Sequence, residues 1–124
     1  MQTLVQFIEH FCEKFADNPC MWEKPGRLKE QPEAKDSAPL AYQPTTYRET
    51  LEQIHEFGAG LMALGVEPGE RVALLSEGRN DWVISEMAIL LNGAINVPLS
   101  VKLSPVELQF RLFHSDSSVL IISE

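Results

Sequence analysis

The sequence has no long hydrophobic run. Its longest apolar stretch, residues 87–91, is far shorter than the ~20 residues that a transmembrane helix requires. The first residues also lack the basic region, the apolar stretch and the small-residue cleavage site of a secretory signal peptide. We therefore expect no transmembrane segment and a cytoplasmic location.

Positive charge is scarce. The chain has 10 Lys and Arg residues against 18 Asp and Glu residues, which gives a formal net charge of −8. Nucleic-acid binding depends on clustered basic side chains that neutralise phosphates. An anionic membrane surface attracts the same side chains. The composition therefore argues against a nucleic-acid partner and against an anionic lipid surface.

Cysteine is scarce as well, because Cys12 and Cys20 are the only two in the chain. Two cysteines do not make the disulfide framework of a small secreted domain. Cys12 falls on the apolar face of a predicted helix and is interpreted as a small core residue. We expect no disulfide between the two, in keeping with a reducing cytoplasm.

Motifs for nucleophilic, phosphate and metal chemistry are absent. The sequence has no G-x-S-x-G elbow and no G-x-x-x-x-G-K-[ST] phosphate loop. The three histidines, His10, His55 and His114, have no partner at metal-ligand spacing and are interpreted as helix-surface residues. We therefore assign no catalytic residue, no cofactor-binding residue and no metal ligand.

The loop at residues 76–81 follows the first strongly apolar segment, where a dinucleotide site would need G-x-G-x-x-G. It has a single glycine, Gly78, and the acidic Glu77 and Asp81 would repel phosphate. We interpret this loop as a strand-to-helix turn. Arg79 is the one residue there that we would test as a contact for an anion.

The N-terminal region predicts a helix followed by a hairpin. Residues 3–16 have apolar side chains at helical spacing, and Thr3 and Gln6 form a capping box. The polar face is mixed rather than basic, so this helix is expected to pack on a domain and not on a membrane. Residues 20–24 and 40–45 favour the two strands of a long-looped hairpin.

The connection inside that hairpin has its own composition. Residues 25–39 are rich in Pro, Lys, Glu and Asp and contain almost nothing apolar. Such a segment cannot bury enough apolar surface to offset the entropy of ordering. We expect a flexible polar loop.

A long helix is predicted to begin at Thr46, which forms a second capping box with Glu49. Gly65 stands where a helix-ending glycine is expected. The small residues at 58–60 would permit close approach to a neighbouring element. Residues 67–70 then fit a type II turn, with Pro and Gly at its two central positions.

Residues 71–123 alternate between strand and helix. Three apolar strands are predicted at residues 71–76, 94–99 and 118–123. Their continuous apolarity indicates that both faces are covered, as in a parallel sheet. The predicted fold class is α/β, a partial doubly wound parallel sheet with the order βαβαβ. The N-terminal helix, the hairpin and the long helix precede it.

Two helices connect these strands. The first, at residues 82–91, is apolar on most sides and is expected to be deeply packed, with Asn80 or Asp81 as its cap. The second begins at a third capping box, formed by Ser104 and Glu107. It runs to about residue 113 on three apolar residues: Val106, Phe110 and Phe113.

Three parallel strands leave open edges and one poorly covered face. We expect that either further sequence completes the sheet or a second copy does. Self-association by edge pairing or by exchange of an element is therefore predicted. Pro98 has no N–H to donate, so it is expected at the end of its strand or on an edge.

Residues 46–124 resemble the N-terminal region of AMP-forming acyl-CoA synthetases of the adenylate-forming superfamily. The similarity is carried by Thr46-Tyr47-x-Glu49, then GAGLMALGVEPGERVALLSEGRNDWV, AILLNGAINVPL and LSPVELQFRLFHSDSSVLII. The bacterial long-chain fatty-acid–CoA ligases are the most similar. Gly78 and Asn80 stand where those sequences commonly show Asn and Pro, a departure that affects the subfamily and not the superfamily.

The resemblance implies that residues 1–124 are the incomplete N-terminal part of a large AMP-binding domain. The implied parent uses ATP and Mg²⁺ to convert a fatty acid to an acyl-adenylate and passes the acyl group to coenzyme A. The family's phosphate loop ending in P-K-G, its acidic ribose-binding residue and its C-terminal lysine have no counterpart here. We therefore expect an inactive scaffold without cofactors of its own, whose partner is the rest of the parent chain.

A different class of protein is the alternative. A free-standing regulatory or interaction module could use the same doubly wound sheet. A phospho-receiver of this kind would need an acidic pair at the end of its first strand, where Glu77 is a lone candidate. A P-K-G segment downstream of this sequence would decide for the synthetase.

Overall fold

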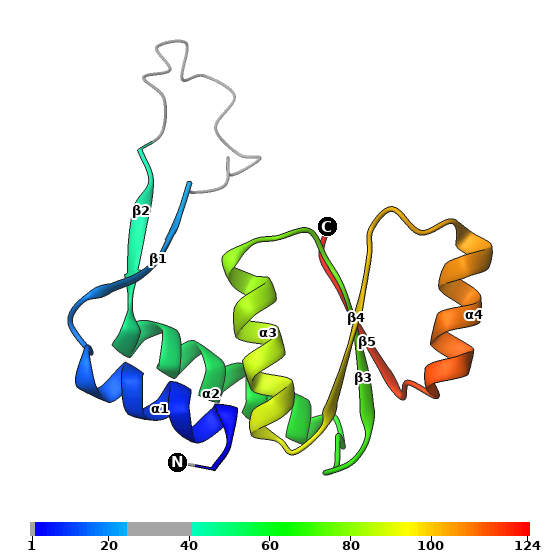
Figure 1. Cartoon of the computed structure of the whole chain (residues 1–124), viewed down its shortest axis with the longest axis horizontal. Helices are drawn as coiled ribbons and strands as arrows, with labels where there is room; N and C mark the ends of the chain where they lie inside the picture. The colour runs from blue at the N-terminus through cyan, green and yellow to red at the C-terminus, as the bar shows by residue number, and fades with distance from the viewer. Residues whose placement is uncertain (1, 25–40) are drawn as a thin grey trace.

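The computed structural model describes residues 2–24 and 41–124 (Figure 1). In chain order its elements are α1 (Leu4–Lys14), β1 (Pro19–Glu23), β2 (Gln43–Thr46), α2 (Tyr47–Ala63), β3 (Arg71–Leu75), α3 (Asn80–Leu91), β4 (Ile95–Leu99), α4 (Pro105–Ser115) and β5 (Val119–Ile122). This order confirms the predicted α/β class. The loop predicted at residues 25–39 lies outside the described residues.

The parallel sheet has the strand order β4-β3-β5, so the first strand of the βαβαβ unit lies in the middle. β3 pairs with β4 from Arg71 opposite Ile95, and with β5 from Val72 opposite Val119. The two crossovers therefore run in opposite directions across the sheet. Because crossovers share one hand, their helices must cover opposite faces. Figure 1 shows α2 and α3 on one side of the sheet and α4 on the other.

The hydrophobic core lies between the sheet and the pair α2 and α3. Val72 and Leu74 of β3 are almost fully buried, as are Ala88 and Ile89 of α3. The buried cluster consists of Ile54, Leu61, Val66, Val72, Ile84, Ala88, Ile89 and Ala94. The deep packing predicted for the helix at residues 82–91 is confirmed on this face.

A glycine on α2 allows the close approach of α3. A Cβ atom at Gly58 would lie 3.2 Å from Cδ2 of Leu91. The side-chain Nδ2 of Asn92 donates a 2.8 Å hydrogen bond to the Gly58 carbonyl oxygen. At Gly60 a Cβ atom would meet nothing within 4 Å. The predicted role of the small residues is therefore met by Gly58 and not by Gly60.

Local signals set both ends of α2. Thr46 Oγ1 accepts a hydrogen bond from the Glu49 N–H, and a Glu49 carboxylate oxygen accepts one from the Thr46 N–H, so the predicted capping box is complete. Gly65 has a φ of +92°. The N–H of Val66 donates to the Leu61 carbonyl at 3.1 Å, which closes the helix in a Schellman motif.

Two turns meet at the start of β3 and β4. The predicted type II turn is confirmed: Glu70 N–H donates to the Glu67 carbonyl at 3.1 Å, and Gly69 has a φ of +85°. Gly69 N–H also donates to the Gly93 carbonyl at 2.9 Å, and Ile95 N–H donates to the Glu70 carbonyl at 2.7 Å. We name these last two hydrogen bonds the turn clasp. They hold the first residues of the two strands together.

The hairpin also forms as predicted, since β1 pairs antiparallel with β2, with an irregularity between Pro19 and Met21. The turn before β1 is fixed to the start of α2. Asn18 contributes its carbonyl to the Tyr47 N–H at 3.0 Å. Arg48 Nη2 lies 2.9 Å from Asp17 Oδ1, and this hydrogen bond raises the pKa of Arg48. Both side chains are exposed, so the pair orients the turn more than it stabilises the fold.

Two predicted helix caps were wrong in detail. The Thr3 side chain accepts from Gln6 N–H, but the Gln6 side chain accepts from Gln2 N–H at 2.9 Å, not from Thr3. At α3 neither Asn80 nor Asp81 is the cap. The cap position is Arg79, which makes no side-chain capping bond. Because no side chain caps α3, the helix is stabilised by the burial of Ile84, Ala88 and Ile89 and not by a polar residue at its start.

The three apolar residues predicted to support α4 are exposed. Val106, Phe110 and Phe113 are 77%, 66% and 79% exposed. The half-buried side chains of the helix include Leu108 and Leu112, on its other side. Both sets recur at helical spacing, so the sequence alone predicted the wrong one as the packed face. We name Val106, Phe110 and Phe113 the α4 stripe.

Both outer strands of the sheet are edges within residues 2–24 and 41–124. Pro98 lies in β4, which is one of these edge strands, as its missing N–H predicts. β5 forms the other edge, and its side chains alternate between half-buried and exposed. The open edges and the poorly covered face predicted from the three-strand pattern are thus both present.

Candidate functional site

The carboxyl ends of β3 and β5 lie beside the first turn of α3. Open parallel sheets bind their ligands at such ends. The connection from β3 is short: Ser76 Oγ donates to the Glu77 carbonyl at 2.9 Å, and the extended Arg79 then starts the helix. Asp81 follows in the first turn, where a carboxylate favours the helix dipole.

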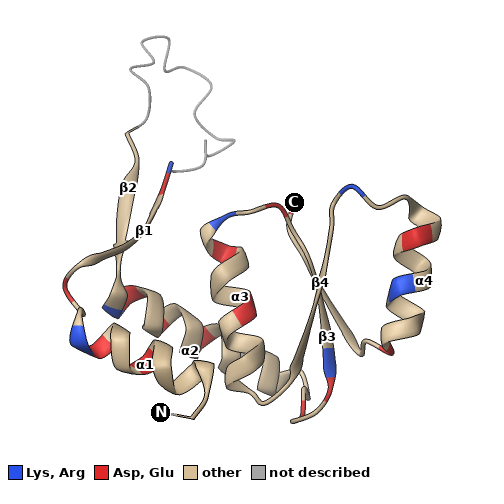
Figure 2. Cartoon of the chain, in the orientation of Figure 1, with Lys and Arg blue, Asp and Glu red and all other residues tan. Residues whose placement is uncertain are grey.

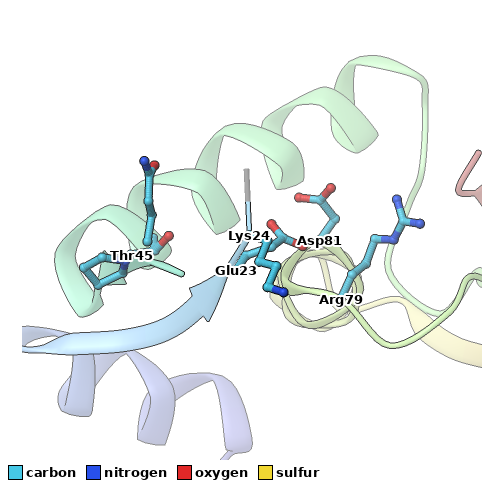
Figure 3. Close-up of a pocket in the computed structure, with 7 residues that line it drawn as sticks. Glu23, Lys24, Thr45, Arg79 and Asp81 are labelled. Atoms are coloured by element: carbon cyan, nitrogen blue, oxygen red, sulfur yellow. The ribbon is translucent and has the colours of Figure 1, made fainter. Parts of the chain in front are cut away.

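Two hollows of about 380 Å³ each flank this turn. The hairpin hollow lies between the end of the hairpin and the start of α3, and it is lined by Glu23, Lys24, Gln43, Pro44, Thr45, Arg79 and Asp81 (Figure 3). The strand-end hollow lies on the other side of Arg79. Its floor is apolar, with Leu74, Ile84 and Ile121 among its lining residues.

Arg79 is shared by the two hollows. In Figure 3 its side chain extends away from Lys24 and the hairpin. Its Nη2 lies 3.4 Å from the backbone oxygen of Glu124. The hairpin hollow also contains Glu23 and Asp81, so its two cations are balanced by two carboxylates. Arg79 as an anion contact therefore stays a prediction.

Sequence reasoning named Arg79 but did not place the hairpin beside it. Glu23 ends β1 and Lys24 follows it, more than fifty residues before Arg79, and only the fold brings them to the first turn of α3. The sequence contained one relevant signal, the predicted pairing of the two hairpin strands. That pairing brings the last residues of the first strand beside the first residues of the second. It carried no information about which helix these residues would meet.

The residues at this turn do not fit the triphosphate of a nucleotide. Gly78 is the single glycine at residues 76–81, so the loop lacks the G-x-G-x-x-G backbone of a phosphate site. Glu77 and Asp81 add negative charge to the loop. No group of three or more His, Cys, Asp or Glu side chains within the described ranges could hold a metal ion. We derive no step of catalysis through ATP or Mg²⁺ from these residues.

The three histidines lie on helix surfaces, as predicted. His10 is exposed on α1. His55 Nε2 on α2 lies 3.6 Å from Glu9 Oε1 on α1. His114, in the last turn of α4, stacks on Phe110 with ring centroids 5.4 Å apart. Each contact belongs to helix packing or to a solvated surface.

The two cysteines are free thiols. Cys12 is only 3% exposed, which confirms its interpretation as a core residue. Burial raises the pKa of the Cys12 thiol, and the neighbouring Cys20 and Glu9 raise it further. A protonated, buried thiol is a poor nucleophile.

Fold and site together define an α/β protein with a three-stranded parallel sheet and two hollows beside the carboxyl ends of its strands. No described helix is both long and apolar enough to cross a membrane. Residues 9–124 match the family model for the AMP-binding enzyme. The chain belongs to the AMP-binding enzyme family.

The relatives with which this chain shares sequence include ligases of long-chain fatty acids. Over 75 residues, 60% of this chain, it is 37% identical to the long-chain-fatty-acid–CoA ligase FadD15 of Mycobacterium tuberculosis. Over 77 residues, 62% of this chain, it is 32% identical to the chloroplastic long-chain-fatty-acid–[acyl-carrier-protein] ligase AEE15 of Arabidopsis thaliana. The matches span 12% and 11% of those two proteins, so the chain corresponds to a small part of each.

Solved structures support the fold. The N-terminal subdomain of NpsA from Klebsiella oxytoca superposes with a TM-score of 0.78 at 19% identity. The superposition covers 98% of this chain and 28% of that one. The whole described architecture, and not only the sheet, is therefore shared with an adenylation-protein subdomain.

Proposed function

We propose that these 124 residues are the N-terminal framework of a long-chain fatty-acid–CoA ligase. The parent enzyme would use ATP and Mg²⁺ to convert a fatty acid to its acyl-adenylate and would then transfer the acyl group to coenzyme A. The observation that carries this proposal is the family match over residues 9–124. The 37% identity to FadD15 supports the long-chain substrate class.

The framework itself is proposed to be inactive. The 124 residues contain no phosphate loop, and the hollows beside Arg79 lack the glycine-rich backbone that a triphosphate requires. Three serines line the strand-end hollow, and no histidine is among the other lining residues; the serines are Ser76, Ser85 and Ser123. The contribution of this part is to hold β3, β4 and β5 in register for residues supplied elsewhere in the parent.

ATP–pyrophosphate exchange with long-chain fatty acids tests the proposal. The purified 124 residues are expected to give no exchange above a protein-free blank, while full-length FadD15 assayed in parallel gives a clear signal. Fatty-acid-dependent exchange by the 124 residues alone would overturn the inactive framework.

The ligase class needs a second experiment. Replacing the matching 75 residues of FadD15 by the aligned residues of this chain should leave a protein that still adenylates fatty acids, with reduced stability. A chimera that melts cooperatively yet has lost exchange would contradict a shared framework role. The family match also favours this class over the free-standing regulatory module.

The partners follow from the same proposal. The rest of the parent chain would cover the open side of the sheet, in the cytoplasm. When the 124 residues are separate, self-association at the open edge of β5 is proposed, because an uncovered edge strand offers unpaired N–H and C=O groups. Light scattering tests this, and a monodisperse monomer at every concentration would count against it.

A further inference from the structure

The chain contains one Asn–Gly pair, Asn92-Gly93, at the end of α3. The other asparagines, Asn18, Asn80 and Asn96, are followed by Pro, Asp and Val. An asparagine before glycine is unusually labile, because glycine has no Cβ atom to hinder attack of its backbone nitrogen on the asparagine side chain. The pair is therefore a candidate for spontaneous deamidation, a modification whose only other reactant is water.

The fold requires both residues of this pair. Gly93 has a φ of +68°, and a Cβ atom there would lie 3.3 Å from the Cβ atom of Pro68, so any other residue would be strained. Asn92 Nδ2 donates a 2.8 Å hydrogen bond to the Gly58 carbonyl oxygen, which joins α3 to α2. Replacing the pair by a less labile one would therefore disturb either the turn after α3 or the contact between the two helices.

The same contacts keep the pair unreactive in the folded chain. Ring closure requires the Gly93 nitrogen to lie on the side of the Asn92 Cβ atom. The ψ of Asn92 is 4°, so this nitrogen instead eclipses the backbone nitrogen of Asn92, roughly a third of a turn away. The Gly93 N–H also donates to the Leu90 carbonyl at 2.9 Å, and the Gly93 carbonyl accepts one bond of the turn clasp. The end of α3 must therefore open before the reaction can occur.

Water has access to this end of α3. Asn92 is half-buried, and it lines an open groove of about 460 Å³ between α2 and α3. Gly58 lies in the same groove, as does Met62, which is 65% exposed. Hydrolysis of a ring formed at residue 92 therefore needs no further rearrangement.

We propose that Asn92 is a deamidation site that the packing of α2 against α3 holds closed, and that its reaction removes this packing irreversibly. The Gly93 nitrogen forms a bond to Asn92 Cγ, the Cγ–Nδ2 bond breaks, and Nδ2 leaves as ammonia with the Gly93 amide proton. Water then opens the succinimide ring at either of its carbonyl carbons, which gives Asp or isoAsp at residue 92. The inference goes beyond the proposed ligase role and does not depend on it.

A carboxylate at residue 92 would destabilise the helix pair. It cannot donate to the Gly58 carbonyl, so that acceptor loses its partner and faces a negative charge. The charge would also lie at the C-terminus of α3, where the helix dipole disfavours an anion. Neither α2 nor α3 has a basic residue in its last turn, and Figure 2 shows the end of α3 without a charged side chain. The new carboxylate would therefore have no cation to offset it.

Peptide mapping by mass spectrometry tests whether the fold holds the site closed. The chain is incubated at mildly alkaline pH, both folded and unfolded in guanidinium chloride. Trypsin then releases residues 80–102 as one peptide, in which Asn80 and Asn96 are internal controls. In the unfolded chain Asn92 should convert well before either control. In the folded chain its conversion should be at least about tenfold slower, because only the opened state reacts.

Substitutions on α2 test the role of helix packing. Gly58→Val crowds Leu91 and should accelerate conversion of Asn92 in the folded chain. Gly60→Val, on the same helix, meets nothing within 4 Å and should leave the rate unchanged. Circular dichroism checks that both variants are folded during the incubation.

The consequence of the reaction is tested with Asn92→Asp, which reproduces one of its products. This variant should lower the midpoint of urea denaturation. Asn80→Asp is the matched control, because it makes the same chemical change at the opposite end of α3, where the helix dipole favours a carboxylate. Its midpoint should be unchanged or higher.

Any of the following results would overturn the proposal: conversion of Asn92 at the same rate in the folded and unfolded chains, an unfolded chain in which Asn92 does not convert before Asn80 and Asn96, equal rates in folded Gly58→Val and Gly60→Val, or an Asn92→Asp variant as stable as the unmodified chain.

Discussion

The two faces of the parallel sheet are covered in different ways. On one face, α2 and α3 pack closely through Gly58 and Ala88 and bury Val72, Ile84 and Ile89 almost completely. On the other, α4 has no buried residue, and its largest apolar side chains point outward. One face therefore has the packing of a finished core, whereas the other leaves Leu120 and Ile122 exposed beside α4. The two faces are formed by one βαβαβ sequence pattern.

The largest expected effect is the loss of a buried side chain on the finished face. Ile89→Ala should reduce the free energy of unfolding by about 2–5 kcal/mol, because a fully buried side chain is replaced by a cavity. Val106→Ala on the α4 stripe should change it by less than about 0.5 kcal/mol. Urea denaturation followed by circular dichroism measures both, and similar losses would mean that the two faces are not different.

The next largest effect on stability is expected at Gly58, where α2 and α3 approach closely. Gly58→Val should cost about 1–3 kcal/mol, because even the Cβ atom of a side chain there would lie 3.2 Å from Leu91 Cδ2. Gly60→Val is the matched control on the same helix, where a Cβ atom meets nothing within 4 Å. It should be close to neutral, within about 0.5 kcal/mol, in the same denaturation experiment. A neutral Gly58→Val would show that α2 and α3 can separate without loss.

Equivalent helix caps should differ between the two faces. Thr46 and Ser104 both complete capping boxes, for α2 and α4 respectively. Thr46→Ala should lower the free energy of global unfolding by about 1 kcal/mol, since α2 is part of the core. Ser104→Ala should fray α4 locally, with a smaller effect on global unfolding. Hydrogen exchange of the α4 amides separates the two responses, and equal global losses would contradict the comparison.

The smallest effect is a pH dependence confined to α4. Hydrogen bonds from the Ser104 backbone N–H and hydroxyl lower the pKa of Glu107 below its ordinary 4.5, and Arg111 adds to this. A carboxyl with a depressed folded-state pKa contributes stability that is present above its ordinary value and is lost as pH falls through the folded value. We expect the start of α4 to fray below about pH 4.5.

Amide chemical shifts of residues 104–108 measured through an acid titration would detect this fraying. Glu107→Gln keeps an acceptor for Ser104 and should remove the pH dependence. If the titration of these amides is the same in that variant, another group is responsible.

Much of the fold follows from local signals in the sequence. The capping boxes at Thr46 and Ser104, the glycine at position 65 and the turn at 67–70 each depend on a few neighbouring residues, and each is confirmed. The apolar strands were equally visible, because continuous apolarity requires cover on both faces. Strand order was not predicted, since it depends on which way each crossover turns.

The wrong predictions concern features that depend on tertiary contacts and not on neighbouring residues in the sequence. α4 has two apolar stripes at helical spacing, and only the position of the sheet selects Leu108 and Leu112 over Phe110. α3 starts without a side-chain cap, so neither Asn80 nor Asp81 marks its first residue correctly. At the candidate site, Arg79 was visible from its loop, but its neighbours Glu23 and Lys24 come from a hairpin whose direction no local pattern specifies.

The turn clasp has a consequence for the order in which the chain folds. Its two hydrogen bonds, from Gly69 to Gly93 and from Ile95 to Glu70, join residues about 25 positions apart and fix how β3 and β4 align. Because the entropy cost of closing a loop grows slowly with its length, the α3 crossover adds little to the cost of forming this contact. During synthesis, β3, α3 and β4 can therefore assemble against α2 before α4 and β5 have left the ribosome. The newborn chain would then already hold this core while α4 and β5 were still being made.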